Sequence, residues 1–197
     1  MKLVIASYNH GKIQELQDLL LPKQLEVISL LDVSRKKIEW KEDGVNFSQN
    51  AAIKVDVVRK VTAYSILADD SGLIVPALGG QPGIFSSRYA GSNASDLENI
   101  DLLLQNMRLL SGERRKAFFV CCICYSRFGA QKDFFYGVLP GYISLSSRGS
   151  SGFGYDPIFM PLESRQTLAE LSSVEKNKMS HRRRALDRFI LQIKRIK

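Results

Sequence analysis

Apolar residues recur along the whole chain with two periods, one typical of helices and one typical of strands. The helical period is clearest in residues 47–64, where one side carries Ala51, Val55, Val58 and Val61. Short apolar runs bounded by polar residues are typical of buried strands. We predict helices over residues 12–21, 47–64 and 95–110, and a last helix that is capped by Ser180 and reaches Ile196. We predict strands over residues 2–6, 25–31, 65–68, 116–126, 132–138 and 141–147.

Helices and strands mix along the chain without an internal repeat, a low-complexity tract or a linker. This mixing predicts an α/β fold. A chain of 197 residues suits one domain, so we expect a single domain over residues 1–197. The 45% hydrophobic and 24% charged residues are ordinary for a globular protein, so no metal or disulfide is needed for folding.

The formal net charge of +8 favours anionic partners, which include nucleic acids, membranes and phosphorylated metabolites. Nine Lys or Arg residues lie between Lys176 and Lys197, with Asp187 as the only acidic residue there. A solvated basic helix and a phosphate-binding surface both fit this run.

The cellular location is indicated by what the sequence contains near its start and in its apolar runs. Residues 1–7 are too short for a signal peptide, and no apolar stretch approaches the ~18 residues of a membrane span. Cys121, Cys122 and Cys124 share one apolar run, so we expect reduced, buried strand residues in a cytoplasmic protein. The only histidines are His10 and His181, which leaves no zinc-binding spacing.

The first segment with candidate chemistry is Ser7–Lys12, between the first predicted strand and helix. Such a junction directs free backbone N–H groups and the helix dipole at one point, which suits a phosphate group. Lys12 adds a positive charge. The segment lacks the P-loop pattern, because Ala6 stands where that pattern has Gly. An ordinary helix cap is the alternative.

The second segment is Ala68–Gly72, where we expect the strand to enter a polar turn. Asp69 and Asp70 would repel one another if both ionised, and a hard divalent cation such as Mg²⁺ would relieve this repulsion. An Asp-rich turn without a ligand is the alternative. Another metal ligand could come from Glu39, Glu42 or Asp43, and spacing alone does not choose among them.

The third segment is Ser151–Pro157, whose two glycines permit a close approach of the backbone to a ligand. Phe153 and Tyr155 could stack on a base, and Asp156 could accept hydrogen bonds. Aromatic residues beside glycines also attach loops to a core, which is the alternative for this segment.

The fourth segment is Lys176–Arg184, where basic side chains at a helix start are opposed by the helix dipole. This mismatch favours an anionic or hydrogen-bonding partner. Because His181 is followed by three arginines, we expect it to contact ligand or solvent.

These four segments, in this order, resemble the inosine triphosphate pyrophosphatase family, also called the Ham1-like or non-canonical purine NTP pyrophosphatases. The similarity spans nearly the whole chain and is strongest in residues 68–73, 82–91, 152–159 and 180–182. The resemblance implies an elongated α/β fold, with a central mixed sheet, flanking helices and two lobes around a nucleotide-binding cleft. It also implies a homodimer. The implied reaction hydrolyses ITP, dITP or XTP to the monophosphate and pyrophosphate, with Mg²⁺, and so clears deaminated purines from the nucleotide pool.

By the same resemblance, Asp70 is the general base and a Mg²⁺ ligand, and Glu42 is the second ligand, with Glu39 as the alternative. The implied substrate-binding residues are Ser7, Tyr8, Asn9, His10, Gly11, Lys12, Ser71, Phe153, Gly154, Tyr155, Asp156, Lys176, His181 and Arg182. The chain departs from the family pattern at Tyr8, because the first loop of the family usually begins Thr-Gly-Asn.

Two other functions fit parts of the sequence. A Maf-like pyrophosphatase would act on pyrimidine or modified nucleotides. A nucleic-acid-binding protein would use the basic C-terminal helix and bind in a salt-dependent way. The second alternative leaves Asp69 and Asp70 unexplained, since carboxylates repel a phosphate backbone in the absence of metal, and we do not expect nucleic acid as a partner.

Overall fold

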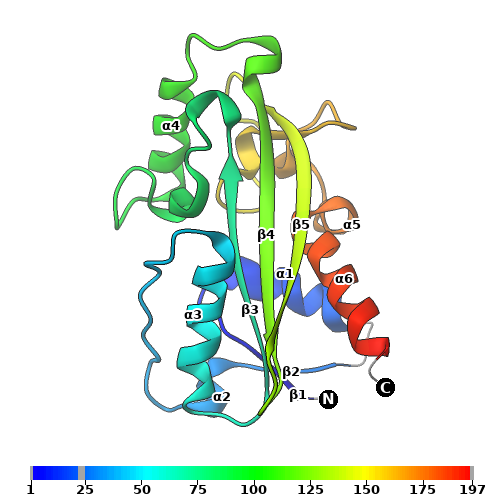
Figure 1. Ribbon diagram of the computed structural model, residues 1–197. Coiled ribbons are helices and arrows are strands. Elements are labelled where there is room, and N and C mark those ends of the chain that lie inside the picture. The colour runs from blue at the N-terminus through cyan, green and yellow to red at the C-terminus, as the bar shows by residue number, and fades with distance from the viewer. Residues whose placement is uncertain (1, 22–24, 196–197) are drawn as a thin grey trace. The chain divides into compact units, whose positions relative to one another are not determined.

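The computed structural model describes residues 2–21 and 25–195. Within these residues one mixed six-stranded sheet has the strand order β2-β1-β3-β4-β5-β6 (Figure 1). The strands are β1 (Lys2–Ile5), β2 (Glu26–Ile28), β3 (Ser65–Ile74), β4 (Lys116–Ser126), β5 (Lys132–Ile143) and β6 (Phe159–Pro161). Strand β1 pairs in parallel with β2 and β3, whereas β5 and β6 are antiparallel. The predicted α/β class with a mixed sheet is confirmed.

The chain divides into two compact units. The first unit comprises residues 1–70, 121–137 and 182–197, and the second comprises residues 71–120 and 138–181. The helices of the first unit are α1 (His10–Leu20), α2 (Leu30–Val33), α3 (Phe47–Arg59) and nearly all of α6 (His181–Arg195). The second unit contains α4 (Asp96–Asn106) and α5 (Ser173–Met179), together with short 3-10 turns.

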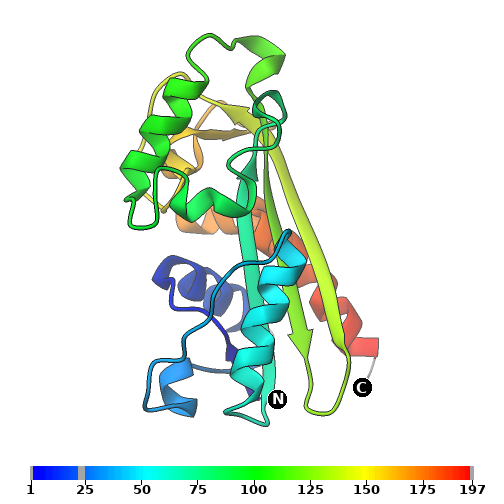
Figure 2. The same ribbon diagram turned by 60° about the vertical axis from the view of Figure 1, so that its left-hand side comes forward.

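The first unit has helices on both faces of its strands, and Figure 2 shows α3 and α6 on opposite faces. Leu3, Ile5 and Leu67 pack with α1 and α6 in one apolar cluster. Their strand neighbours Val4 and Ile66 pack with α3 in another cluster. Successive strand residues point to opposite faces, so an unbroken apolar run fills both layers.

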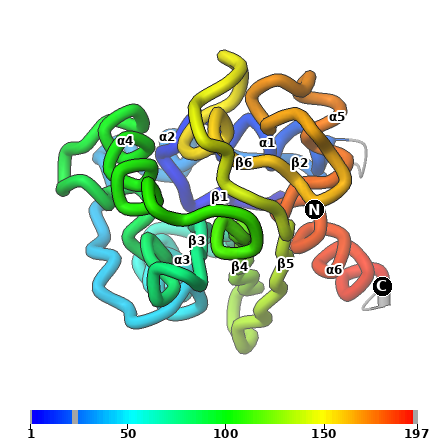
Figure 3. Tube along the Cα trace, turned by 90° about the horizontal axis from the view of Figure 1, so that it is seen from above, coloured from blue at the N-terminus to red at the C-terminus, as the bar shows by residue number. Residues whose placement is uncertain are grey.

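The second unit has its own core, built from residues of β3, β4, β5 and α4. Figure 3 shows α4 and α5 on opposite sides of β4 and β5. The buried guanidinium of Arg115 donates hydrogen bonds to the carbonyl oxygens of Met107, Leu110, Ile143 and Ser144, at 2.6–3.1 Å. One side chain thereby satisfies the carbonyl groups of two separate segments, which would be costly to bury unpaired.

Several predicted boundaries are wrong. The predicted strand 25–31 is shorter, because Ser29 and Asp32 form a capping box that begins α2. Helix α3 ends at Arg59, so Val61 lies beyond it and is 44% exposed. The separate strand predicted over 141–147 does not form, since β5 continues without a break to Ile143. The prediction also missed α5 and β6.

No helix in the described ranges is both long and apolar enough to cross a bilayer. The prediction that Cys121, Cys122 and Cys124 are buried strand residues is confirmed, because all three lie fully buried in β4.

Candidate functional site

The two adjacent carboxylates lie within a strand, and the turn predicted over residues 69–72 is wrong. Strand β3 runs unbroken from Ser65 to Ile74, with β1 and β4 as its neighbours in the sheet. Pairing on both sides of a central strand overrides the turn preference of Asp, Ser and Gly. Because side chains alternate along a strand, Asp69 shares the face of Leu67, which packs with α1 and α6. Asp70 shares the face of Ala68, toward α3.

The Asp70 carboxylate is 5% exposed and is held by two polar residues of α3. Asn50 Nδ2 donates to Asp70 Oδ2 at 3.1 Å, and Lys54 Nζ lies 3.4 Å from Asp70 Oδ1. The same ammonium group lies 2.8 Å from Glu42 Oε1 and donates to the carbonyl oxygen of Asp69 at 2.8 Å. Glu42 and Asp70 therefore share one buried cation.

Burial and charge act in opposite directions on these groups. Burial raises the pKa of Asp70 above its ordinary value, and the positive charges of Lys54 and Lys12 offset only part of this effect. For Lys54, burial acts to lower the pKa, but the carboxylates of Asp70, Asp69 and Glu42 together outweigh it and raise the pKa. Lys54 is therefore a permanent cation beside the two carboxylates.

On the other face of β3, Asp69 belongs to a second set of buried ion pairs. Lys12 Nζ lies 3.0 Å from Asp69 Oδ2, and Arg182 Nε lies 3.7 Å from the same oxygen. Arg182 also donates to Glu15 Oε2 at 2.7 Å. The basic residue at the start of α6 thus has anionic partners inside the protein, from α1 and β3. These anionic partners offset the unfavourable interaction between the Arg182 side chain and the dipole of α6.

The first unit therefore contains seven charged side chains in mutual ion pairs, five of them buried and two, Lys12 and Glu42, partly exposed; we call this group the ionic cluster. It comprises Lys12, Glu15, Glu42, Lys54, Asp69, Asp70 and Arg182. Three cations face four carboxylates, so the cluster carries one net negative charge when every member is ionised. Buried charges need this pairing, because an isolated buried charge is very costly.

Residues 7–12 form the start of α1, and Asn9 is its N-cap. The side chain of Asn9 accepts a hydrogen bond from the backbone N–H of Lys12 at 2.9 Å, and Ser7 Oγ accepts from the N–H of Asn9 at 3.2 Å. His10 and Gly11 are the first helical residues, and helix geometry leaves their N–H groups without intrahelical partners. The ordinary helix cap is therefore present, and it leaves donors available at the helix end.

A cavity of about 330 Å³ lies beside this segment in the first unit. Its walls include Ser7, Tyr8 and His10, but most of its lining consists of apolar side chains from α1, β2 and α2. This lining does not suit a triphosphate, which needs cationic groups and N–H donors.

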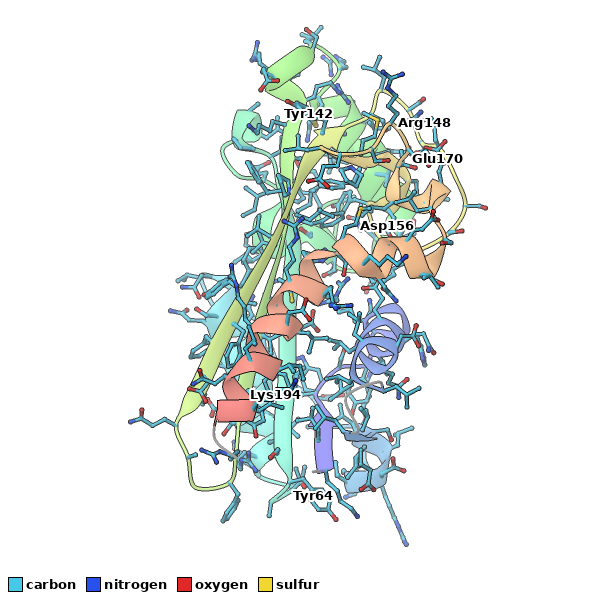
Figure 4. The ribbon with its side chains drawn as sticks, turned by 90° about the vertical axis from the view of Figure 1, so that its right-hand side faces the viewer. Tyr64, Tyr142, Arg148, Asp156, Glu170 and Lys194 are labelled. Carbon is cyan, nitrogen blue, oxygen red and sulfur yellow. The ribbon has the colours of Figure 1, made fainter. Side chains whose placement is uncertain are left out.

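In the second unit, Asp156 holds together the loop that carries Phe153 and Gly154. Asp156 Oδ2 accepts from the N–H of Phe153 at 2.9 Å and lies 2.6 Å from Lys176 Nζ of α5 (Figure 4). Lys176 Nζ also lies 4.7 Å from the centre of the Phe153 ring. The N–H of Gly154 donates to Asp96 Oδ2 at 2.7 Å.

A neighbouring glycine makes this arrangement possible. At Gly152, φ is +82°, and a Cβ atom there would lie 2.1 Å from Asp156 Oδ2. Only glycine fits this position without moving the carboxylate.

Three other predicted residues have their own places in the second unit. Tyr155 lies in the apolar core and donates its hydroxyl to the carbonyl oxygen of Ser86 at 2.9 Å. Ser71 follows Asp70 on β3 and is half-buried. His181 is 2% exposed and stacks on Phe119 at a ring distance of 4.8 Å. The predicted contact of His181 with solvent is therefore wrong, since its ring is buried against Phe119, whereas the alternative contact with a ligand stays a prediction.

The donor set around Asp70 bears on whether a metal ion fits there. Among the described residues, no group of three or more His, Cys, Asp or Glu side chains is arranged as a metal site. Asp70 and Glu42 nevertheless approach the same Lys54 ammonium, at 3.4 and 2.8 Å. Two carboxylates completed by phosphate oxygens and water form a common Mg²⁺ site in phosphate-binding enzymes, so these two residues fit that ion.

The sequence prediction missed three members of the site region: Asn50, Lys54 and Glu15. A signal for the first two was present, because Asn50 and Lys54 share the helix face of Ala51, Val55 and Val58. Polar residues on a buried helix face need partners. Glu15 had no such signal, because its partner Arg182 is 167 residues away in the sequence.

Comparisons with known proteins match almost the whole chain. A model of the Ham1 family matches residues 3–192. A dITP/XTP pyrophosphatase of Bacillus licheniformis is 43% identical over 188 residues, which are 95% of each chain. That of Bacillus subtilis is 40% identical over 186 residues, which are 94% of this chain and 93% of the relative.

Solved structures agree with these sequence comparisons. The Ham1 protein of Staphylococcus aureus has a TM-score of 0.87 at 37% identity and covers 100% of both chains. A HAM1 protein from Coxiella burnetii has a TM-score of 0.87 at 39% identity and covers 99% of both chains.

Proposed function

Since the chain belongs to the Ham1 family, we propose that it hydrolyses non-canonical purine nucleoside triphosphates, namely ITP, dITP and XTP, to the monophosphate and pyrophosphate. The relatives named dITP/XTP pyrophosphatase support this substrate class. The observation that carries the proposal is the buried Asp70 carboxylate, held by Asn50 and Lys54 with Glu42 on the same ammonium. Such hydrolysis would remove deaminated purines from the nucleotide pool.

Asp70 is the proposed general base. Its carboxylate oxygens have fixed positions, because Asn50 donates to one and Lys54 lies beside the other. A base held in this way can accept a proton from a water molecule that attacks the α-phosphorus. Proton transfer to a positioned base accelerates a reaction by about 10²–10⁴-fold. Asp69 is not the proposed base, because Lys12 and Arg182 already pair with its carboxylate.

Asp70 and Glu42 are the proposed ligands of Mg²⁺, and Glu42 is preferred to Glu39 because it shares the Lys54 ammonium with Asp70. The bound ion would supply charge neutralisation for the phosphate oxygens. Phosphoryl-transfer enzymes generally use a divalent cation for this purpose.

The triphosphate is proposed to bind at the start of α1, through residues 7–12. His10 and Gly11 contribute backbone donors at the positive end of the helix, and Lys12 contributes a cation. Stabilising the charge of the departing pyrophosphate is the expected role of Lys12.

The nucleoside part of the substrate is proposed to involve a separate group of residues. These are Ser71, Phe153, Gly154, Tyr155, Asp156, Lys176, His181 and Arg182. Phe153 offers an aromatic face for a base, and Asp156 and Lys176 offer an acceptor and a donor in one fixed pair. A site that hydrogen-bonds the 6-oxo group of a purine would reject the 6-amino group of adenine, because buried polar groups would lose their partners.

A substrate panel tests the proposal. Purified protein with Mg²⁺ is given ITP, dITP, XTP, ATP, GTP and a set of pyrimidine triphosphates, and phosphate and pyrophosphate are measured separately. We expect pyrophosphate to be released fastest from ITP, dITP and XTP, whose purines carry a 6-oxo group and lack the 2-amino group of guanine. Release of single phosphate, a preference for ATP, or a preference for pyrimidine nucleotides would contradict it, and the last result would favour the Maf-like alternative.

The remaining features of the proposal concern the protein as a whole. We propose that the chain acts as one catalytic domain, forms a homodimer and works in the cytoplasm. Light scattering of the purified protein at several concentrations tests the dimer, for which the expected mass is twice the 22.2 kDa of the chain.

A further inference from the structure

Tyr8 connects two segments of the first unit that are far apart in sequence. Its hydroxyl accepts a hydrogen bond from the backbone N–H of Ile38 at 2.8 Å. Its ring stacks on Trp40, with 5.3 Å between ring centres and 11° between planes. Lys37 Nζ lies 5.9 Å from the centre of the Tyr8 ring. Residues 7–12, where the triphosphate is proposed to bind, are called the phosphate loop below. One side chain of this loop thus contacts three residues of a distant segment.

The segment that Tyr8 contacts is residues 34–46, which contains Glu42. It has no helix or strand, and Figure 2 shows it running from α2 to the start of α3. Its last residues are held by α3, because Asn50 accepts from the N–H of Gly44 at 2.9 Å and Gln49 accepts from the N–H of Val45 at 3.0 Å. Its first half is held by Tyr8, through Ile38 and Trp40.

Glu42 lies between these two attachments. It is two residues after Trp40 and two residues before Gly44, and its carboxylate reaches Lys54 Nζ at 2.8 Å. In a segment without regular hydrogen bonding, the position of a side chain depends on its nearest fixed points. A change at Trp40 is therefore transmitted to Glu42 through one intervening residue.

We infer that Tyr8 is a positioning residue, which fixes Glu42 relative to the phosphate loop by stacking on Trp40 and accepting from Ile38. The inference rests on the proposed function for the metal-binding role of Glu42. It predicts that occupancy of the phosphate loop and binding of Mg²⁺ are coupled through Tyr8. Loss of the Tyr8 side chain would remove both the ring and the hydroxyl from residues 34–46.

The chain offers a direct signal for the contact between Tyr8 and Trp40, because Trp40 is its only tryptophan. Intrinsic fluorescence and acrylamide quenching therefore report on the stacked pair alone, without substrate. The variants are Tyr8→Gly, which removes both contacts, and Tyr8→Phe, which keeps the ring and removes the hydroxyl. The matched control is Tyr64→Gly, because Tyr64 is a 42% exposed tyrosine of the same unit outside both segments.

For Tyr8→Gly we expect a red-shifted Trp40 emission that acrylamide quenches more strongly. We also expect the Mg²⁺ concentration for half-maximal turnover to rise about tenfold, which is the size of a lost aromatic contact and hydrogen bond together. Tyr8→Phe should keep the wild-type quenching and most of the Mg²⁺ affinity, and Tyr64→Gly should match wild type in both.

Two results would overturn the inference. One is wild-type quenching of Trp40 in Tyr8→Gly, since the ring would then not hold the segment. The other is a fall in kcat at saturating Mg²⁺ with an unchanged Mg²⁺ requirement, since Tyr8 would then act on the phosphate loop alone. Failure of the proposed function has a different signature, namely wild-type protein that shows no Mg²⁺-dependent release of pyrophosphate. The quenching measurement is independent of that outcome.

Discussion

Asparagine substitutions of Asp69 and Asp70 should change stability and activity in different ways, although the two residues are neighbours. Because side chains alternate between the two faces of β3, Asp69 lies beside Lys12 and Arg182, whereas Asp70 lies beside Asn50 and Lys54. Asparagine keeps the size of the side chain and removes its charge. The comparison therefore isolates the electrostatic role of each carboxylate.

The size of each effect follows from the contacts. Removing one partner of a buried ion pair costs about 3–5 kcal/mol. Asp69→Asn should cost about 3 kcal/mol, the lower end of that range, because Arg182 keeps Glu15 at 2.7 Å. In a chain of this length that loss corresponds to a fall in Tm of about 6–12 °C.

Asp70→Asn should leave the free energy of unfolding within about 1 kcal/mol of wild type, or raise it. Burial raises the pKa of Asp70, so the folded state holds its ionised form less favourably than the unfolded chain does. Lys54 also keeps Glu42 and the Asp69 carbonyl as partners. Turnover should nevertheless fall by at least about 10²-fold, because the proposed base is gone.

The assay combines urea unfolding at pH 7.5, followed by circular dichroism, with pyrophosphate release from dITP. Linear extrapolation gives the free energy of unfolding, and equal m-values show that the variants unfold from comparable states. Equal losses of stability in both variants would refute the separation of the two carboxylates. Retained turnover in Asp70→Asn would remove its proposed role as base.

Three further outcomes are expected. Gly152→Ala should raise KM about tenfold or more, because the added Cβ displaces the Asp156 carboxylate. Gly129→Ala is the control and should leave KM unchanged, since Gly129 has a similar positive φ and no atom within 4 Å of the added Cβ. Burial raises the pKa of Cys122 to about 11 and of Cys124 to about 12. Thiol reagents at pH 8 should therefore label the native protein slowly, and the rate should increase as the pH rises. Unfolding in urea should expose all three cysteines at once. Chelation by EDTA should stop pyrophosphate release, and added Mg²⁺ should restore it; turnover in excess EDTA would exclude the proposed metal.

The sequence predicted the fold class well, because periodicity reports burial directly. The hairpin strands β4 and β5 and the helix α4 carry long, regular patterns, and their start positions were predicted to within one residue. The polar turn at Asp69 was wrong, since local preference for a turn is weaker than pairing of a central strand on both sides. Short elements such as α2 were missed because four residues are too few for a period.

The candidate site was predictable where a motif is local. Residues 7–12 and 151–157 are continuous segments, and their glycines and polar residues distinguish them in the sequence. Partners that come from different segments were not predictable, and Arg182 is the clearest example. Its helix-dipole mismatch signalled an anion, but sequence alone could not say that the anion is Glu15 of the same chain.

Arg115 has a consequence for how this protein can vary. Its four hydrogen bonds all go to carbonyl oxygens of the main chain, and every amino acid supplies that group whatever its side chain. Positions 107, 110, 143 and 144 can therefore change among residues of suitable size without losing these bonds. Position 115 cannot change in the same way, because a lysine ammonium has three donors in a different geometry. Selection on this part of the protein should act on one codon while its four partners drift.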